Sequence, residues 1–148
     1  MPKLSDIEIM KRASLILERK AKYEVTVASS ENVRAFLQTK FYGADREIFS
    51  VMFLNTKNQL IAYEEMFKGT IDRASVYPRE IAKRALQHNA KSVVLSHNHP
   101  SGNSTPSDAD VIITTKLIEC LGVFDICVLD HIIVGKGEST SFAEQGLL

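Results

Sequence analysis

Residues 97–110 have the sequence HNHPSGNSTPSDAD, and the elements on either side of them decide the fold. The preceding residues 91–96 form a short apolar run that Asn, Pro and Gly follow at once, a pattern that predicts a buried strand. From Ser107 onward, apolar residues recur with the period of an α-helix. We therefore expect the stretch to connect the carboxyl end of a strand to the first turn of a helix.

Three side chains in this stretch are common metal ligands. His97 and His99 are two residues apart, so their imidazoles point to the same side of an extended segment, and Pro100 stiffens the chain after them. Asp110 falls in the first turn of the predicted helix and faces back toward the loop. We expect the two imidazoles and the carboxylate to converge on one point.

Zinc suits this ligand set, because imidazole and carboxylate are its usual ligands, although the metal that is loaded in the cell stays open. Catalytic zinc sites use three protein ligands from His, Asp, Glu and Cys and leave the fourth position to water, whereas structural sites are closed by four ligands that usually include cysteine. Neither Cys120 nor Cys127 belongs to the stretch. The pattern therefore favours an open site with a bound water, and hydrolysis at such a site also needs a carboxylate base.

Each half of the pattern also has a purely structural interpretation. Ser107 and Asp110 are spaced like a helix capping box, in which the acid reaches back to the first residue. A His-x-His pair after a strand is often a pair of satisfied polar side chains. The two halves together are far more restrictive than either alone, and the combination favours a metal site.

The spacing His97-x-His99-x7-Ser107-x-x-Asp110 resembles the JAMM motif of the MPN (JAB) metallopeptidases, zinc hydrolases of peptide and isopeptide bonds. The likeness extends from Val25 to Leu148, and five further segments resemble the bacterial RadC-like branch of that family: Phe67–Thr70, Tyr77–Glu80, Ser96–Gly102, Val128–His131 and Ser141–Glu144. The resemblance implies an α+β fold of the MPN/JAB (cytidine-deaminase-like) kind, with a mixed, largely antiparallel, curved sheet flanked by helices.

The resemblance also implies a role for each motif residue. His97, His99 and Asp110 would bind zinc, and Ser107 would stabilise the oxyanion of the tetrahedral intermediate. Asn98 is a departure, because peptidases of the wider family commonly have Ser or Thr between the histidines. The departure leaves the ligand set intact and the class of substrate open.

In the wider family an upstream glutamate activates the water. Glu47 fits its usual place, at the entrance of an early strand after the first helix of the domain, while Glu64 and Glu65 on the following strand are rivals. Solvated surface charge is the alternative interpretation of all three. His131 interrupts a β-rich run, which predicts either a group that orients a ligand or a satisfied core histidine. His88 ends a predicted helix, where we expect it to interact with the last carbonyls, outside the site.

The composition predicts one compact domain without general affinity for nucleic acid. A chain of 148 residues that is 45% hydrophobic can bury a core of its own. Lys plus Arg and Asp plus Glu each number 18, so net charge gives DNA binding no support. Cys120 and Cys127 lie in apolar segments, which predicts buried free thiols. No stretch resembles a signal peptide or a membrane span, so we expect a cytoplasmic protein that does not bind membranes.

The chain divides into a predicted N-terminal helical arm, residues 1–24, and an MPN domain, residues 25–148. Full-length RadC-like relatives carry a helix-hairpin-helix module ahead of the catalytic domain, and we expect that module to be absent here. In chain order, the other predicted elements are a helix from Ser5 to about Glu18, an edge strand Tyr23–Val27, a helix from Ser30, a hairpin of Glu47–Asn55 and Gln59–Phe67, a loop Gly69–Val76, a helix from Pro78 with an apolar stripe of Ile81, Ala82, Ala85 and Leu86, a β-rich run Phe124–Val134, and a short strand and tail Ser141–Leu148.

The predicted function is zinc-dependent hydrolysis of an amide or isopeptide bond in a peptide or protein substrate. The alternative is a RadC-like protein of DNA repair or recombination that acts as a binding or scaffold domain without peptidase activity. The identity of the substrate and the oligomeric state stay open, with a homodimer among the alternatives.

Overall fold

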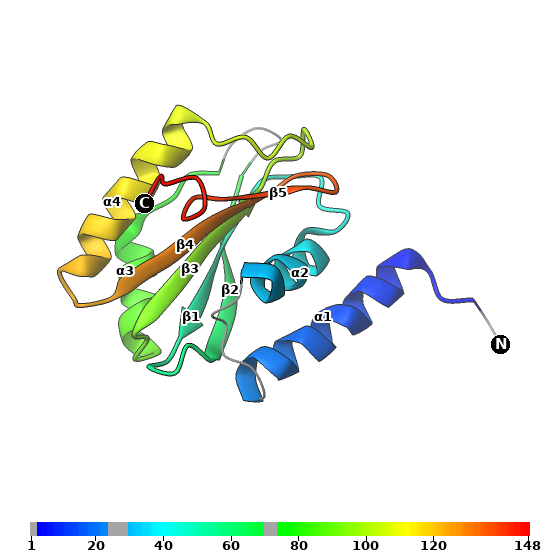
Figure 1. Ribbon diagram of the computed structural model, residues 1–148, viewed down its shortest axis with the longest axis horizontal. Helices are drawn as coiled ribbons and strands as arrows, with labels where there is room; N and C mark the ends of the chain where they lie inside the picture. The colour runs from blue at the N-terminus through cyan, green and yellow to red at the C-terminus, as the bar shows by residue number, and fades with distance from the viewer. Residues whose placement is uncertain (1–2, 24–29, 70–73) are drawn as a thin grey trace.

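The computed structural model describes residues 3–23, 30–69 and 74–148, and within them one five-stranded sheet has helices on both faces (Figure 1). The strand order is β2-β1-β3-β4-β5, antiparallel at every pair except β3 with β4. The strands are β1 Ile48–Leu54, β2 Leu60–Lys68, β3 Ser92–Asn98, β4 Cys127–Val134 and β5 Ser139–Ser141. The predicted α+β class with a mixed, largely antiparallel sheet is confirmed.

Four helices complete the described fold: α1 Asp6–Tyr23, α2 Ser30–Phe41, α3 Pro78–Gln87 and α4 Asp108–Gly122. Helices α3 and α4 cover one face of the sheet, and α2 covers the other with α1 packed outside it (Figure 1). Helix α4 forms the crossover between the parallel strands β3 and β4. It therefore starts near the carboxyl end of β3, where ligand sites of parallel strands are usually found.

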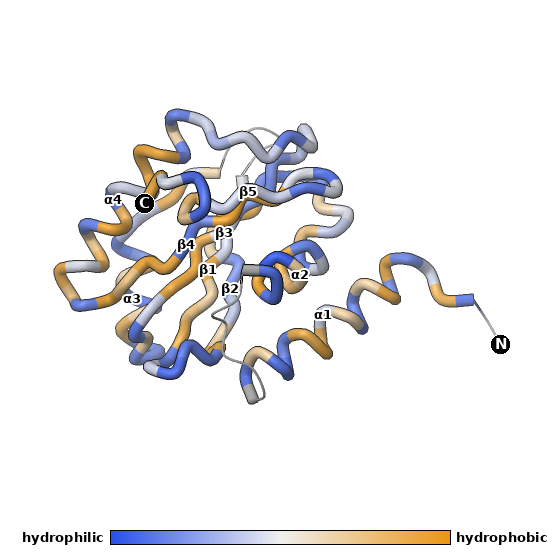
Figure 2. Tube along the Cα trace, in the orientation of Figure 1, coloured by the Kyte–Doolittle hydropathy of each residue, from blue (hydrophilic) through white to orange (hydrophobic). Residues whose placement is uncertain are grey.

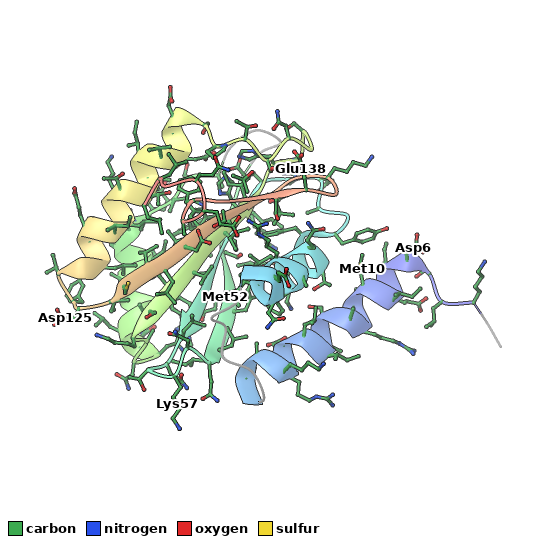
Figure 3. All side chains as sticks on the ribbon, viewed as in Figure 1. Asp6, Met10, Met52, Lys57, Asp125 and Glu138 are labelled. Carbon is green, nitrogen blue, oxygen red and sulfur yellow. The ribbon has the colours of Figure 1, made fainter. Side chains whose placement is uncertain are left out.

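The central strands are buried on both faces. All seven residues of β3 are buried, and along β1 the side chains alternate between two apolar cores, as the period of a strand requires. Phe49, Val51 and Phe53 pack under α3 and α4, whereas Met52 and Leu54 pack under α2. Met52 is labelled in Figure 3. Such strands read as continuous apolar runs in the sequence, which is why both were identified without the structure.

Helix α1 packs against α2, and hydrophilic and hydrophobic residues alternate along it (Figure 2). Ser5 and Glu8 form the predicted capping box, in which the Ser5 backbone N–H donates to Glu8 Oε2 over 2.8 Å. Leu17 and Ala21 pack against the core beneath α2. The helix continues past its predicted end at Glu18 to Tyr23.

The other elements agree with the sequence in kind but not in every bound: β4 begins at Cys127 rather than Phe124, and β5 ends at Ser141, where the last strand was predicted to begin. The hairpin β1–β2 and the starts of α2 and α3 are confirmed. Tyr23 ends α1, and the rest of the predicted edge strand, together with the boundary between arm and domain, lies outside the described residues, as do residues 70–73 of the predicted loop. Leu86 is half exposed at the end of α3, beyond its buried stripe, so its assignment to that stripe is wrong.

Cys120 and Cys127 are free thiols, but only the first is partly buried. The prediction that Cys127 is buried is wrong, because it is the first residue of β4 and follows the exposed turn at residues 123–125. Among the described residues no helix has the length and apolarity needed to cross a membrane.

Candidate metal centre

The carboxyl end of β3 brings the two histidines together. His97 is the penultimate residue of β3 and is buried, and His99 follows the strand while its backbone N–H still donates to Val134 O of β4 over 2.9 Å. The two Nε2 atoms are 3.0 Å apart. The extended backbone therefore places both imidazoles on one side, as the spacing predicts.

The first turn of α4 supplies the carboxylate. Ser107 is the N-cap residue: its Oγ accepts from the Asp110 backbone N–H over 3.1 Å, and its own N–H donates to Asp110 Oδ2 over 2.9 Å. The capping box is therefore present in addition to the ligand cluster. It fixes the rotamer of Asp110, so the structural and the metal-binding interpretations of this pair reinforce each other.

The three candidate ligands form a small triangle. Asp110 Oδ1 is 3.2 Å from His97 Nε2, and Asp110 Oδ2 is 3.2 Å from His99 Nε2. An ion with tetrahedral bonds of about 2.0–2.1 Å separates its ligand atoms by about 3.3 Å. The two imidazole nitrogens are therefore close to the spacing that one small cation requires, and each is near a different oxygen of Asp110. One ligand atom from each of the three residues lies within 4.8 Å of the others.

The hydrogen bonds around the triangle direct a lone pair of His99 and the charged carboxylate of Asp110 toward its centre, which favours a positive charge there. His99 Nδ1 lies 2.8 Å from Asn103 O, and because a carbonyl only accepts, Nδ1 carries the hydrogen and Nε2 keeps its lone pair in the neutral ring. Burial opposes ionisation of Asp110, but hydrogen bonds with His97 and His99 hold its pKa well below the usual value. Asp110 in turn raises the pKa of His99. A proton or a cation between these groups satisfies all of them, so the donor set fits a metal ion.

Glu47 lies beside the triangle. It precedes β1, which pairs antiparallel with β3 so that Phe49 is opposite His97. Its Oε1 is 4.0 Å from His97 Nε2, and its side chain is largely buried. Burial raises the pKa of Glu47, although His97 and His99 act in the opposite direction. A carboxylate with a raised pKa next to a metal site has the properties of a general base.

The two rival glutamates have other partners. Arg84 Nε donates to both carboxylate oxygens of Glu64, over 3.0 and 2.9 Å, and His88 Nε2 is 2.9 Å from Glu64 Oε1. The hydrogen bonds from Arg84 lower the pKa of Glu64 to about 2, which makes it a poor base. Glu65 lies 3.6 Å from Lys68. The side chain of His88 thus contacts a carboxylate rather than the helix carbonyls that were predicted.

A cleft of about 710 Å³ opens over the triangle. His97, His99, Asp110, Ser107 and Glu47 all line it, which brings every predicted site residue to one place. Its remaining lining residues are mostly apolar and come from four segments: Phe49, Ala74, Val76, Pro100, Ala109 and Ile113, with Ser101.

The loop after His99 is held by the turn that follows β4. Lys136 N donates to Gly102 O over 2.8 Å, and Ser104 N donates to Glu138 Oε1 over 2.8 Å. Gly135 approaches this loop so closely that a Cβ would lie 2.3 Å from Gly102 O, so glycine is required there. In Figure 3, Glu138 marks this end of the molecule, opposite Lys57 at the tip of the β1–β2 hairpin.

The role of Asn98 was not predicted from the sequence. Its Oδ1 accepts from Ile48 N over 2.7 Å, and its Nδ2 donates to Arg46 O over 2.9 Å. One buried amide therefore bonds the backbone on both sides of Glu47. The Glu47 carbonyl itself accepts from Gly69 N over 2.8 Å. The single hydroxyl of Ser or Thr could not reach both Ile48 N and Arg46 O. Asparagine at position 98, where the wider family commonly has Ser or Thr, therefore has a structural reason.

We expect Asn98→Ala to lower the free energy of unfolding by about 2 kcal/mol, because two partly buried backbone groups lose their partner, each at the lower end of the range of about 1–3 kcal/mol. Denaturant unfolding followed by circular dichroism measures the change. Gln145→Ala, at an exposed position, is the control and should change the free energy by less than about 0.5 kcal/mol. Equal stabilities of the two variants would contradict this role of Asn98.

Comparisons with known proteins show the family of the chain. A family model described as a RadC-like JAB domain matches residues 27–147. A UPF0758 protein of Cellvibrio japonicus (strain Ueda107) is 54% identical over 122 residues, which are 82% of this chain and 54% of that protein. A UPF0758 protein of Vibrio cholerae serotype O1 is 48% identical over 140 residues, which are 95% of this chain and 88% of that protein. UPF0758 protein YeeS of Escherichia coli (strain K12) is 54% identical over 124 residues, which are 84% of each chain.

The matched part covers only 54% to 62% of the length of three of the relatives. The names of the relatives state no activity. The comparisons therefore show the family, and the chemistry has to be argued from the site.

Proposed function

We propose that this chain, which belongs to the RadC-like JAB domain family, is a zinc-dependent hydrolase of amide bonds. His97, His99 and Asp110 would hold the ion. The observation that carries the proposal is the arrangement of these ligands with Glu47. The two imidazole Nε2 atoms lie 3.0 Å apart, each lies 3.2 Å from a different oxygen of Asp110, and the largely buried carboxylate of Glu47 lies 4.0 Å from His97 Nε2 in the same cleft. Ligands of this kind also favour zinc over Mg²⁺ or Ca²⁺, which prefer oxygen.

Zinc at this point would act as a Lewis acid on a carbonyl oxygen and lower the pKa of a water ligand to about 7. The protein's own groups then divide the remaining work. Glu47 takes a proton from the attacking water and delivers it to the leaving amine. Its raised pKa suits both steps, because the same carboxyl must first accept the proton and later release it.

Ser107 supports the developing oxyanion. Its Oγ already accepts a hydrogen bond from the Asp110 backbone N–H, and its hydroxyl hydrogen has no acceptor among the described residues. Since Ser107 lines the cleft, that hydrogen can be donated to a substrate oxygen as negative charge forms there. The cap fixes the position of the hydroxyl before the substrate arrives.

A peptide or protein is the substrate class that we propose. Apolar side chains of Val76 and Ile113 face the cleft that contains the polar cluster. An amide carbonyl at the ligands would place a neighbouring side chain against these residues. An apolar substituent is therefore expected next to the scissile bond.

Removal of the metal tests the proposal. Zinc-loaded protein is assayed against a panel of fluorogenic peptide amides and isopeptides, then after chelation and dialysis, and again after zinc is restored. We expect hydrolysis that disappears with the metal and returns with it, and that His99→Ala abolishes. His88→Ala, which changes a histidine outside the cleft, is the matched control and should retain activity. Hydrolysis that survives chelation would contradict the proposal.

A further inference from the structure

His131 lies in the interior behind the candidate metal centre. It is fully buried on β4, where its ring stacks on Phe142 with centroids 4.7 Å apart and meets the edge of Phe49 at 5.5 Å. Both ring nitrogens have partners: Nε2 is 2.8 Å from His97 Nδ1, and Nδ1 is 2.6 Å from Thr114 Oγ1. The two alternatives for this residue are thus combined, since a satisfied core histidine directly contacts a candidate ligand.

The direction of each hydrogen bond can be assigned from one end. Thr114 Oγ1 lies 2.6 Å from Asp110 O, and because a carbonyl only accepts, the Thr114 hydroxyl donates its single hydrogen there. Thr114 Oγ1 must then accept from His131 Nδ1. A ring buried between aromatic side chains is neutral and has one N–H, so His131 Nε2 accepts from His97 Nδ1. His97 therefore carries its hydrogen on Nδ1 and directs the lone pair of Nε2 at the centre of the triangle.

The bonds also connect ligands from different elements. His97 belongs to β3, His131 to β4, and Thr114 and Asp110 to α4. The path from His97 through His131 and Thr114 ends on the backbone of Asp110, whose side chain is 3.2 Å from His97. An ion between the two ligands would close this path into a ring.

The C-terminal segment holds His131 in place. Asp130 Oδ1 accepts from the backbone N–H groups of His131 and Ala143, over 2.7 and 3.0 Å, and Asp130 Oδ2 accepts from Ser141 Oγ. The backbone N–H of Phe142 donates to His131 O over 2.9 Å. The same acid thus fixes the strand and the segment whose aromatic ring covers His131.

We infer that His131 and Thr114 are positioning residues that fix the tautomer of His97 in the form able to bind a metal ion. The inference rests on the proposed metal site and deepens it. Neither residue lines the cleft, so neither touches the substrate. Their effect passes through the hydrogen on His97 Nδ1, as it does for outer partners of metal-binding histidines in general.

Thr114→Val gives the sharpest test. Valine has the same shape but no hydroxyl, so His131 Nδ1–H loses its acceptor and the ring gains by moving its hydrogen to Nε2. That hydrogen would then be donated to His97 Nδ1, and His97 would be left with its own hydrogen on Nε2, the atom that must bind the ion. We expect the affinity for Zn²⁺ to fall about 10–100-fold, the range for loss of an outer partner.

Thr115→Val is the matched control. Thr115 is the next residue of α4, and its hydroxyl also donates to the carbonyl four residues earlier, Val111 O, over 3.1 Å, but it is exposed and has no contact with His131. Zinc affinity is measured by competition with a chromophoric chelator, and the hydrogen positions of His97 are measured by ¹⁵N NMR of the ring. The control should match the wild type in both measurements.

Two further variants keep the test decisive. His131→Leu removes the acceptor for His97 and should weaken zinc binding at least as much as Thr114→Val, whereas His131→Gln restores an amide oxygen and should recover part of the affinity. Wild-type affinity in both Thr114→Val and His131→Leu would overturn the inference. A wild-type protein that binds no zinc would instead refute the proposed metal site itself.

Discussion

Asp110→Ala is expected to abolish stoichiometric zinc binding. The substitution removes the only carboxylate of the triangle and with it the negative charge that balances the cation. The affinity should fall by more than the roughly 100-fold that marks the upper range for outer partners, because Asp110 is itself a ligand in this account. Metal content per chain, measured by mass spectrometry after dialysis, should be close to one in the wild type and close to zero in the variant.

Two controls separate the ligand from the cap. Asp108→Ala removes an exposed carboxylate from the same first turn of α4 and should leave zinc bound. Ser107→Ala breaks the capping box, at a cost of about 1 kcal/mol of stability, and should also retain the metal. If Asp110→Ala kept one zinc per chain, the carboxylate would be only a helix cap.

Glu47→Gln is expected to lower hydrolysis by about 10²–10⁴-fold while the metal stays bound, the range for loss of a general base. The amide has nearly the shape of the carboxylate but cannot take a proton from water. The activity of the zinc-loaded variant is compared with that of the wild type on the best substrate of the panel. Zinc content is measured on the same sample, so that loss of the base is distinguished from loss of the ion.

Glu64→Gln is the matched control for the base. Its partners Arg84 and His88 lie outside the cleft, so activity should not change. Stability should fall by at most about 1 kcal/mol, as for other partly exposed ion pairs. Equal activity of wild type and Glu47→Gln would show that another group activates the water.

The cluster of candidate ligands could be predicted from the sequence because its geometry is local. His97 and His99 need only an extended backbone, and Asp110 needs only a helix that starts at Ser107. The same locality explains why the capping box was recognised. The structure brings these residues together without any adjustment of their predicted elements.

The choice among three glutamates depended on tertiary structure. The pairing of β1 with β3 places Glu47 at the triangle, whereas Glu64 meets Arg84 from α3, twenty residues away in sequence. Neither the strand register nor the position of α3 follows from the local pattern. Propensity and spacing therefore gave three candidates, and only the packed fold shows which of them lies beside the candidate ligands.

The contact of Thr114 with His131 was not predicted, although the sequence contains a signal for it. Thr114 is four residues after Asp110 and shares the buried side of α4 with Leu117 and Leu121. A polar residue in that series requires a buried partner, and the partner, His131, interrupts an otherwise apolar strand. A polar residue on the buried face of a predicted helix and another within a predicted apolar strand can therefore be tested as partners of one buried hydrogen bond.

Anomalous X-ray scattering at the zinc absorption edge, from crystals of the zinc-loaded protein, tests the central claim most directly. The account predicts one strong peak within about 2.0–2.2 Å of His97 Nε2, His99 Nε2 and a carboxylate oxygen of Asp110. A fully loaded protein without a peak at this position, or with its zinc held by other residues, would contradict it.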